Sequence, residues 1–320
     1  HVLVDEVRGA TNYLVSNDTA AEVDDNTFVA SLDSDGFTVG DDVVVNTNTE
    51  NYVSWNWKAG GAPTVDNSAG AGATPTAGSV KIDGSNLGSA LAGSIAATRL
   101  SANTTNGFSI VEYVGTGNNE TIAHGLSEAP ELIIVKNYTD SPDSDAWVVG
   151  SSKGMDFTDF MLLNDDRAAA DADVVWNDTA PSATVFTKGT GGNGNSDGYP
   201  VIAYCFHSVE GYSKIGSYVG NGDPDGPFIY LGFSPEWYMT KRLDSTGDWR
   251  IRDMAREPFN PQDAPIFADT SGAENDGDND WDSVSNGLKL RASGTGENAS
   301  GGDYLYMAFA ETPFRTANAR

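Results

Sequence analysis

The chain has 320 residues, of which 39% are hydrophobic and 10% are aromatic, and its formal net charge is −28 at pH 7. This length allows two to three domains, and the composition supplies enough apolar residues for packed cores, which excludes wholesale disorder. The acidic excess argues against nucleic acid as a partner, because phosphate contacts need clustered Lys and Arg. No apolar run reaches the length of a membrane span, so membrane insertion is not expected.

Residues 1–61 read as the back half of a unit that occurs again near the C-terminus. The motif Asp5-Glu-Val-Arg8 aligns with Asp253-Met-Ala-Arg256. The front half of the unit has no counterpart at the N-terminus, so we expect the sequence to begin inside a domain. A sandwich without these strands exposes apolar surface and strand edges. We expect the partial unit to pack on the second unit of its own chain or, as the favoured alternative, to be completed by a neighbouring subunit of a homo-oligomer.

Residues 62–106 interrupt the pattern of strands. The stretch 62–78 consists almost entirely of Ala, Gly, Pro, Thr, Ser, Asn and Asp. Such a composition is too poor in large apolar groups for a core of its own and predicts an extended connection. Two alternatives follow, an ordered linker along the surface of the next unit or an exchanged arm that docks on a neighbouring subunit.

Residues 107–211 and 212–320 read as two copies of one unit. Matching residues recur in the same order at spacings of 102 to 105 residues, which indicates an internal repeat. Both copies contain short runs of β-branched and aromatic residues bounded by Gly, Asn, Asp and Pro. We therefore predict an all-β protein of tandem antiparallel β-sandwich domains, jelly-roll or Greek-key in type, related by this repeat. The matching pairs are Tyr113 with Tyr218, Pro130 with Pro235, Trp147 with Trp249, and Phe206 with Phe309.

The strand predicted at 201–206 carries apolar side chains on both faces. Val201, Ala203 and Cys205 fall on one face, and Ile202, Tyr204 and Phe206 fall on the other. This pattern predicts a strand that is buried on both sides. Cys205 is the one cysteine of the chain, which excludes an intrachain disulfide, and its place in this strand predicts a buried structural thiol.

Several runs, taken in order, resemble one known group of proteins. They include WNWKAGG at 55–61, YCFHSVEGYSK at 204–214 and YMAFAETPF at 306–314. These runs resemble the repeated C-terminal domains of tail-fibre-like virion proteins of tailed bacteriophages, especially marine phages. The resemblance covers nearly the whole chain. It implies a non-enzymatic structural protein of the virion, a tail fibre or a capsid-associated fibre or decoration, that assembles with copies of itself and with other virion proteins.

No catalytic constellation stands out in the sequence, and the resemblance implies none. His124 lies in a His-Gly turn and His207 ends the strand at 201–206. The repeat places Lys58 and Ala310 at the positions equivalent to His207, which argues against a shared catalytic histidine. The enzymatic alternative is a glycan depolymerase. Asp and Glu are abundant, so the sequence does not single out a particular pair of carboxylates for this activity. We expect no catalytic residue and no cofactor.

Two Trp-Asp motifs in polar loops suggest carbohydrate binding, and with it adhesion to a glycan of the host surface. Sandwich domains hold sugars by stacking an aromatic ring under the apolar sugar face, while Asp or Asn takes the hydroxyls. The candidate residues are Trp176 with Asp178 and Trp281 with Asp282. The alternative is that each Trp folds back as a lid on its sandwich.

An acidic run near the C-terminus offers ligands for a metal ion. Alternate carboxylates in a loop are the hard-oxygen ligands that Ca²⁺ accepts, although the EF-hand order and its closing Glu are missing. A solvated acidic turn is the alternative. The candidate ligands are Asp276, Asp278, Asp280 and Asp282.

Overall fold

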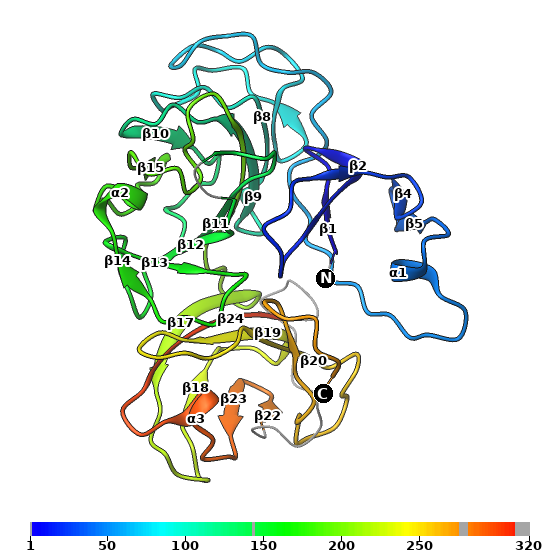
Figure 1. Ribbon diagram of the computed structural model, residues 1–320, viewed down its shortest axis with the longest axis vertical. Helices are drawn as coiled ribbons and strands as arrows, with labels where there is room; N and C mark the ends of the chain where they lie inside the picture. Colours follow the sequence, from blue (N-terminus) through cyan, green and yellow to red (C-terminus); the bar gives the residue numbers. More distant parts are fainter. Residues whose placement is uncertain (1, 143–144, 275–280, 311–320) are drawn as a thin grey trace.

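The computed structural model of the chain describes residues 2–142, 145–274 and 281–310 (Figure 1). Within these ranges the protein consists of six β-sheets and three helices of four residues each, and none of these helices is long and apolar enough to cross a membrane. The expectation of an all-β protein with sandwich-like packing is confirmed. The helices are α1 Val43–Asn46, α2 Asp173–Trp176 and α3 Thr295–Asn298.

A nine-stranded sheet forms the centre of the second unit. Its strands lie in the order β14-β13-β12-β11-β16-β9-β8-β6-β7. Neighbouring strands are antiparallel except for β6 and β8, which pair in parallel. The strands are β6 Val80–Ile82, β7 Ser85–Asn86, β8 Arg99–Asn103, β9 Phe108–Val114, β11 Leu132–Asn137, β12 Val148–Ser151, β13 Asp159–Leu162, β14 Ala170–Asp171 and β16 Pro200–Phe206.

A two-stranded sheet of β10 Glu120–Ala123 and β15 Val185–Lys188 covers one face of this large sheet. The core between them consists mainly of aliphatic side chains with a few aromatic rings. The rings of Tyr113 and Phe186 meet edge to face with centroids 6.1 Å apart, and both side chains are fully buried. The second unit is therefore a sandwich with one large and one small layer.

The third unit consists of a five-stranded sheet and a three-stranded sheet. The strand orders are β17-β24-β19-β20-β21 and β18-β23-β22. The run β17-β24-β19-β20 repeats the order of β9-β16-β11-β12, as the internal repeat predicts; the repeat itself stays a prediction. The strands are β17 Ser213–Val219, β18 Phe228–Tyr230, β19 Pro235–Arg242, β20 Arg250–Asp253, β21 Ile266–Phe267, β22 Trp281–Val284, β23 Gly287–Leu290 and β24 Asp303–Ala310.

The two large sheets pack against each other in a shared core. Ile202, Tyr204 and Phe206 point into this core, whereas Val201, Ala203 and Cys205 point into the core under β10 and β15. Phe206 meets Phe309 of the third unit edge to face at 6.2 Å. The prediction that strand 201–206 is buried on both sides is therefore confirmed. Because the units share this core, they are expected to unfold together.

Residues 62–106 form part of the second unit, which corrects the expectation of a linker or arm. They supply β6, β7 and β8 to the nine-stranded sheet. Ala97, Leu100 and Ala102 are fully buried in its core. Small residues are needed here because backbones approach closely. A Cβ added to Gly93, which has a φ of +99°, would lie 2.8 Å from the carbonyl oxygen of Thr121, so a larger residue would require the backbone to move.

The first unit contributes two separate small sheets. β1 Val2–Asp5, β2 Gly9–Val15 and β3 Val23–Asp24 form one sheet, and β4 Val29–Leu32 pairs with β5 Phe37–Val39 in the other. Val7 and Leu14 enter the shared core. Packing of β1 and β2 on the rest of the chain is therefore observed, whereas completion by a neighbouring subunit stays a prediction.

Consecutive units meet in the same way. The indole N–H of Trp147 donates to the carbonyl of Val15 in the first unit at 3.0 Å. One unit later, the indole N–H of Trp249 donates to the carbonyl of Leu162 in the second unit at 2.8 Å. Trp147 of the second unit thus packs at the end of β2 in the first unit, and Trp249 of the third unit packs at the end of β13 in the second unit.

Candidate functional site

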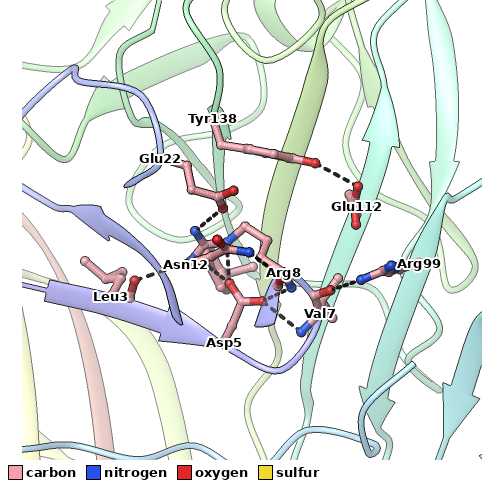
Figure 2. A network of polar contacts seen from close by, with 10 residues as sticks. Leu3, Asp5, Val7, Arg8, Asn12, Glu22, Arg99, Glu112 and Tyr138 are labelled. Atoms are coloured by element: carbon pink, nitrogen blue, oxygen red, sulfur yellow. Dashed lines mark hydrogen bonds and ion pairs between the residues drawn. The ribbon is translucent and has the colours of Figure 1, made fainter. Parts of the chain in front are cut away.

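A polar cleft of about 200 Å³ lies where the first unit meets the second (Figure 2). The β1–β2 hairpin supplies one wall and the strands β8 and β9 supply another. Nearly all of the lining is charged or hydrogen-bonding. The lining residues are Arg8, Asn12, Glu22, Asp66, Arg99, Glu112 and Tyr138.

Arg8 is held by the tight turn that joins β1 to β2. One carboxylate oxygen of Asp5 accepts the backbone N–H groups of Val7 and Arg8, each at 2.9 Å, which fixes the turn. The other oxygen of Asp5 accepts Nε of Arg8 at 2.7 Å. Arg8 then donates through Nη1 to Glu22 at 2.7 Å. Both Arg8 and Asp5 are buried, so each needs the charge of the other.

The same turn occurs in the third unit. Asp253 accepts the backbone N–H of Arg256 at 3.0 Å and its Nε at 2.7 Å, and Arg256 donates through Nη1 to Glu274 at 2.7 Å. The sequence alignment of Asp5 and Arg8 with these residues therefore identified a shared local structure.

Glu112 and Tyr138 form the other side of the cleft. The hydroxyl of Tyr138 donates to Glu112 at 2.7 Å. Burial raises the pKa of Glu112, and burial also raises the pKa of Glu22, against the lowering effect of Arg8. Figure 2 shows Tyr138 reaching across the cleft from the side of Glu22 to Glu112.

The contacts of these carboxylates decide what the cleft can do. A carboxyl group with a raised pKa suits general acid catalysis, and glycoside hydrolysis pairs one such acid with a second carboxylate that is ionised. Here one oxygen of Glu22 is held by Arg8 and one oxygen of Glu112 is held by Tyr138. Arg99 on β8 also donates to the carbonyl of Val7 at 2.9 Å. The geometry supports a polar junction that fixes the first unit on the second.

A second hollow, the aromatic groove, has a volume of about 440 Å³ and lies between residues 53–58 and the strands β19 and β24. Trp57 meets Trp237 edge to face at 5.3 Å, and Trp55 meets Trp237 at 6.1 Å. Trp55 and Trp57 are half-buried, so parts of their rings face solvent. Glu236 and Asp253 are the acidic residues of the lining.

The structure corrects the prediction that Trp176 and Trp281 stack on sugars. Trp176 and Trp281 are both 0% exposed, so neither ring offers a face to a ligand. Trp176 packs edge to face on Phe157 at 5.3 Å, and Trp281 packs on Tyr218 at 5.9 Å. Asn177 and Asp178 lie in the turn after α2 and Asp282 lies on β22, while both tryptophan rings fold inward. The lid alternative describes both of them.

The acidic candidates do not come together as a site. Asp178 is exposed beside the buried Trp176, and Asp282 forms an ion pair with Arg291 at 2.6 Å. Asp276, Asp278 and Asp280 lie outside the described residues. Over residues 2–142, 145–274 and 281–310 there is no group of three or more His, Cys, Asp or Glu side chains that could hold a metal ion.

His124 and Cys205 have structural surroundings. His124 is buried, Nδ1 accepts the backbone N–H of Leu126 at 3.1 Å, and Nε2 lies 3.1 Å from the carbonyl of Ser182. Burial lowers the pKa of His124 to about 4, so the ring is neutral at pH 7. Burial raises the pKa of Cys205 to about 12, which leaves an unreactive thiol.

The comparison with known families covers almost the whole chain. A family model described as a domain of unknown function, DUF7483, matches residues 1–313. The chain belongs to the DUF7483 family. No curated protein and no solved structure matches this DUF7483 chain. The family extends across the first, second and third units, in agreement with the core that they share.

Sequence reasoning missed both hollows of this DUF7483 protein. The cleft joins Arg8 to Glu112 and Tyr138, which are more than a hundred residues away, and the groove joins Trp55 to Trp237. A single sequence carries no sign of such distant pairs. The one available signal was local, the recurrence of the Asp-x-x-Arg turn.

Proposed function

We propose that this protein is a non-enzymatic structural component of a bacteriophage particle, a tail fibre or capsid-associated fibre or decoration, and that it works by assembling with copies of itself and with other virion proteins. The proposal rests on the resemblance of its repeated runs to tail-fibre-like proteins and on one feature of its surface. Its place would then be the virion, outside the host cell.

The observation that carries the proposal is an uncovered apolar surface on the first unit. Fourteen large hydrophobic residues are exposed among the described ones, and seven of them lie within residues 23–52. Concentrated apolar surface of this kind marks interaction sites in soluble proteins. The seven, called here the 23–52 surface, are Val23, Leu32, Phe37, Val39, Val43, Val44 and Tyr52.

Mass measurement over a wide dilution range tests the proposal. Sedimentation of the full chain should show oligomers at high concentration that dissociate on dilution, because assembly is governed by mass action. The chain mass of 33.7 kDa sets the monomer reference. A monomer at every concentration would leave the assembly role without support.

Adhesion to a host glycan is a second candidate, and the aromatic groove favours it. A half-exposed tryptophan pair near the carboxylate of Glu236 suits the stacking of a sugar and the binding of its hydroxyls. A glycan array probed with the wild-type chain and with Trp55→Ala tests this function, with Trp176→Ala as the buried control. Loss of binding in Trp55→Ala alone supports adhesion. Release of sugar from host polysaccharide would favour the glycan depolymerase instead.

A further inference from the structure

One edge of β1 is uncovered at a position that is filled in both other units. In the second unit β11 pairs with β12 on one edge and with β16 on the other, and in the third unit β19 pairs in the same way with β20 and β24. β1 corresponds to β20, because the same Asp-x-x-Arg turn follows each of them. Among the described strands β1 pairs only with β2, and residues 51–59 belong to no strand. The described part of the first unit therefore lacks the strand that β11 and β19 provide.

The third unit shows which neighbour each backbone group of such a strand faces. Met254, directly after β20, donates its N–H to the carbonyl of Glu236 on β19 at 2.9 Å. Backbone groups of alternate residues point to the same edge of a strand, so Ile251 faces β21 instead. The carbonyl of Ile251 accepts Nη2 of Arg256 at 3.4 Å on that side, and β19 still pairs with β20 along the other edge.

The same contact occurs on β1 and leaves its outer edge open. The carbonyl of Leu3 accepts Nη2 of Arg8 at 3.3 Å. By the comparison with the third unit, Leu3 faces β2, and the backbone groups of Val2 and Val4 face the uncovered edge. Such an edge presents N–H and C=O groups that can pair with a further strand.

The strand at this position also joins consecutive units, because it ends in a lysine. Nζ of Lys136 on β11 donates to the carbonyl of Thr19 in the first unit at 3.0 Å. Nζ of Lys241 on β19 donates to the carbonyls of Asp166 and Arg167 in the second unit, each at 2.9 Å. The second and third units therefore each hold the unit before them through a lysine as well as through a tryptophan.

The third unit has an equivalent acceptor. At both junctions the carbonyl that accepts the lysine lies four residues after the carbonyl that accepts the indole N–H. The two pairs are Val15 with Thr19 and Leu162 with Asp166. Phe267 takes the place of Leu162 in the third unit, because the residue after each of them donates its N–H to the carbonyl of the tryptophan in the same unit. The equivalent acceptor is therefore the carbonyl of Ser271, an exposed residue.

The first unit already lies beside this part of the third unit. Ser16 donates through Oγ to the carbonyl of Ala268 at 2.7 Å. Val2 on β1 pairs with Val15, the residue before Ser16. The start of β1 and the end of β21 are therefore neighbours. A strand that ran antiparallel to β1 on its uncovered edge would place its last residues near Ser271.

We propose that the uncovered edge of β1 takes a β-strand from polypeptide outside residues 1–320, with the chemistry of β11 and β19. This strand has large apolar residues followed by a lysine, and the ammonium group of the lysine reaches the carbonyl of Ser271. A second copy of the chain has no such strand to give, because β11 and β19 are each paired on both edges. The contact goes beyond the proposed function, since it needs no assembly of copies.

A labelled peptide tests this contact with the full chain. The probe is PEWYMTKR, the sequence of β19, and its binding is followed by fluorescence anisotropy. One variant peptide carries Lys241→Met, which removes the ammonium group. Another carries Tyr238→Pro, which removes a backbone N–H on the side that pairs with β20 and keeps the lysine. Hydrogen–deuterium exchange of the chain with and without the probe then locates the binding site.

The probe should bind saturably and slow the exchange of residues 2–5, while residues 37–39 stay unchanged. The Tyr238→Pro peptide should not bind, because it cannot form the ladder with β1. The Lys241→Met peptide should bind about tenfold more weakly, since it loses a charge-assisted hydrogen bond.

Four outcomes overturn the inference. They are no saturable binding at about 1 mM probe, equal binding of all three peptides, protection that spares residues 2–5, and protection of residues 2–5 in the chain alone as its concentration rises. The last outcome would show that a second copy covers the edge. A chain that stays monomeric at every concentration but binds the probe would remove the proposed assembly and support this contact.

Discussion

Lys188 places an amino group in the core of the second unit. Its side chain is fully buried, and Nζ lies 3.9 Å from the centre of the Trp176 ring. No hydrogen-bond partner for Nζ occurs among the described residues. Burial lowers the pKa of Lys188 to about 7. The contact with Trp176 is a cation–π interaction that offsets part of the cost of burying the charge.

Replacing Lys188 by Met should change the pH dependence of stability. The pKa of lysine in an unfolded chain is about 10.4, so between about pH 7 and pH 10 the unfolded chain binds more protons than the folded one. This lysine therefore lowers the free energy of unfolding most below pH 7, and its effect fades as pH rises through this window. We expect Lys188→Met to gain most over the wild type near pH 6 and least near pH 10, measured by urea denaturation. A difference in the free energy of unfolding between Lys188→Met and the wild type that does not change with pH would contradict this prediction.

Glu297 and Arg252 form a buried ion pair in the third unit. Two hydrogen bonds of 2.9 Å join them, and Thr240 donates to the same carboxylate at 2.6 Å. Glu297→Ala removes the carboxylate that faces a fully buried guanidinium, so we expect the free energy of unfolding to fall by about 3 to 5 kcal/mol. Arg167→Ala, which breaks the exposed pair with Asp165, should cost about 1 kcal/mol or less. Equal losses in the two variants would show that burial of the pair is not what matters.

At the scale of elements, the equivalent tryptophans give the sharpest comparison. Trp147 is 0% exposed and Trp249 is 1% exposed, and each donates its indole N–H to the preceding unit. Trp147→Ala and Trp249→Ala should each lower the free energy of unfolding by about 3 to 5 kcal/mol, because each leaves a large cavity and an unpaired carbonyl. Chemical denaturation measures both. A cost near zero for either one would set the two positions apart and weaken the internal repeat.

The strands were predictable where large apolar residues decide the structure. The alternation in 201–206 indicated burial on both faces, and the structure has it. The same reasoning failed for 62–106, because Ala and Gly suggest a linker when read alone. In the structure Ala97 is fully buried, and a Cβ added to Gly93 would lie only 2.8 Å from the carbonyl oxygen of Thr121. Close backbone approach is a tertiary property that composition does not carry.

The candidate site was less predictable than the fold. The polar residues that surround Trp176 and Trp281 in the sequence predict exposed rings, yet both rings fold into the core. Trp55 and Trp57, which line the aromatic groove, are not among the sugar-binding residues that the sequence predicts. Whether a ring faces solvent depends on the sheet opposite it, and one sequence does not reveal that sheet.

For the whole molecule, the central claim is that assembly covers the 23–52 surface. Hydrogen–deuterium exchange of the full chain at high and low concentration tests it most directly, because it reports on this segment by itself. The account predicts slow exchange within residues 23–52 in the assembled protein and fast exchange after dilution to the monomer, with the strands of the shared core unchanged. Fast exchange of residues 23–52 in an assembled sample would contradict it.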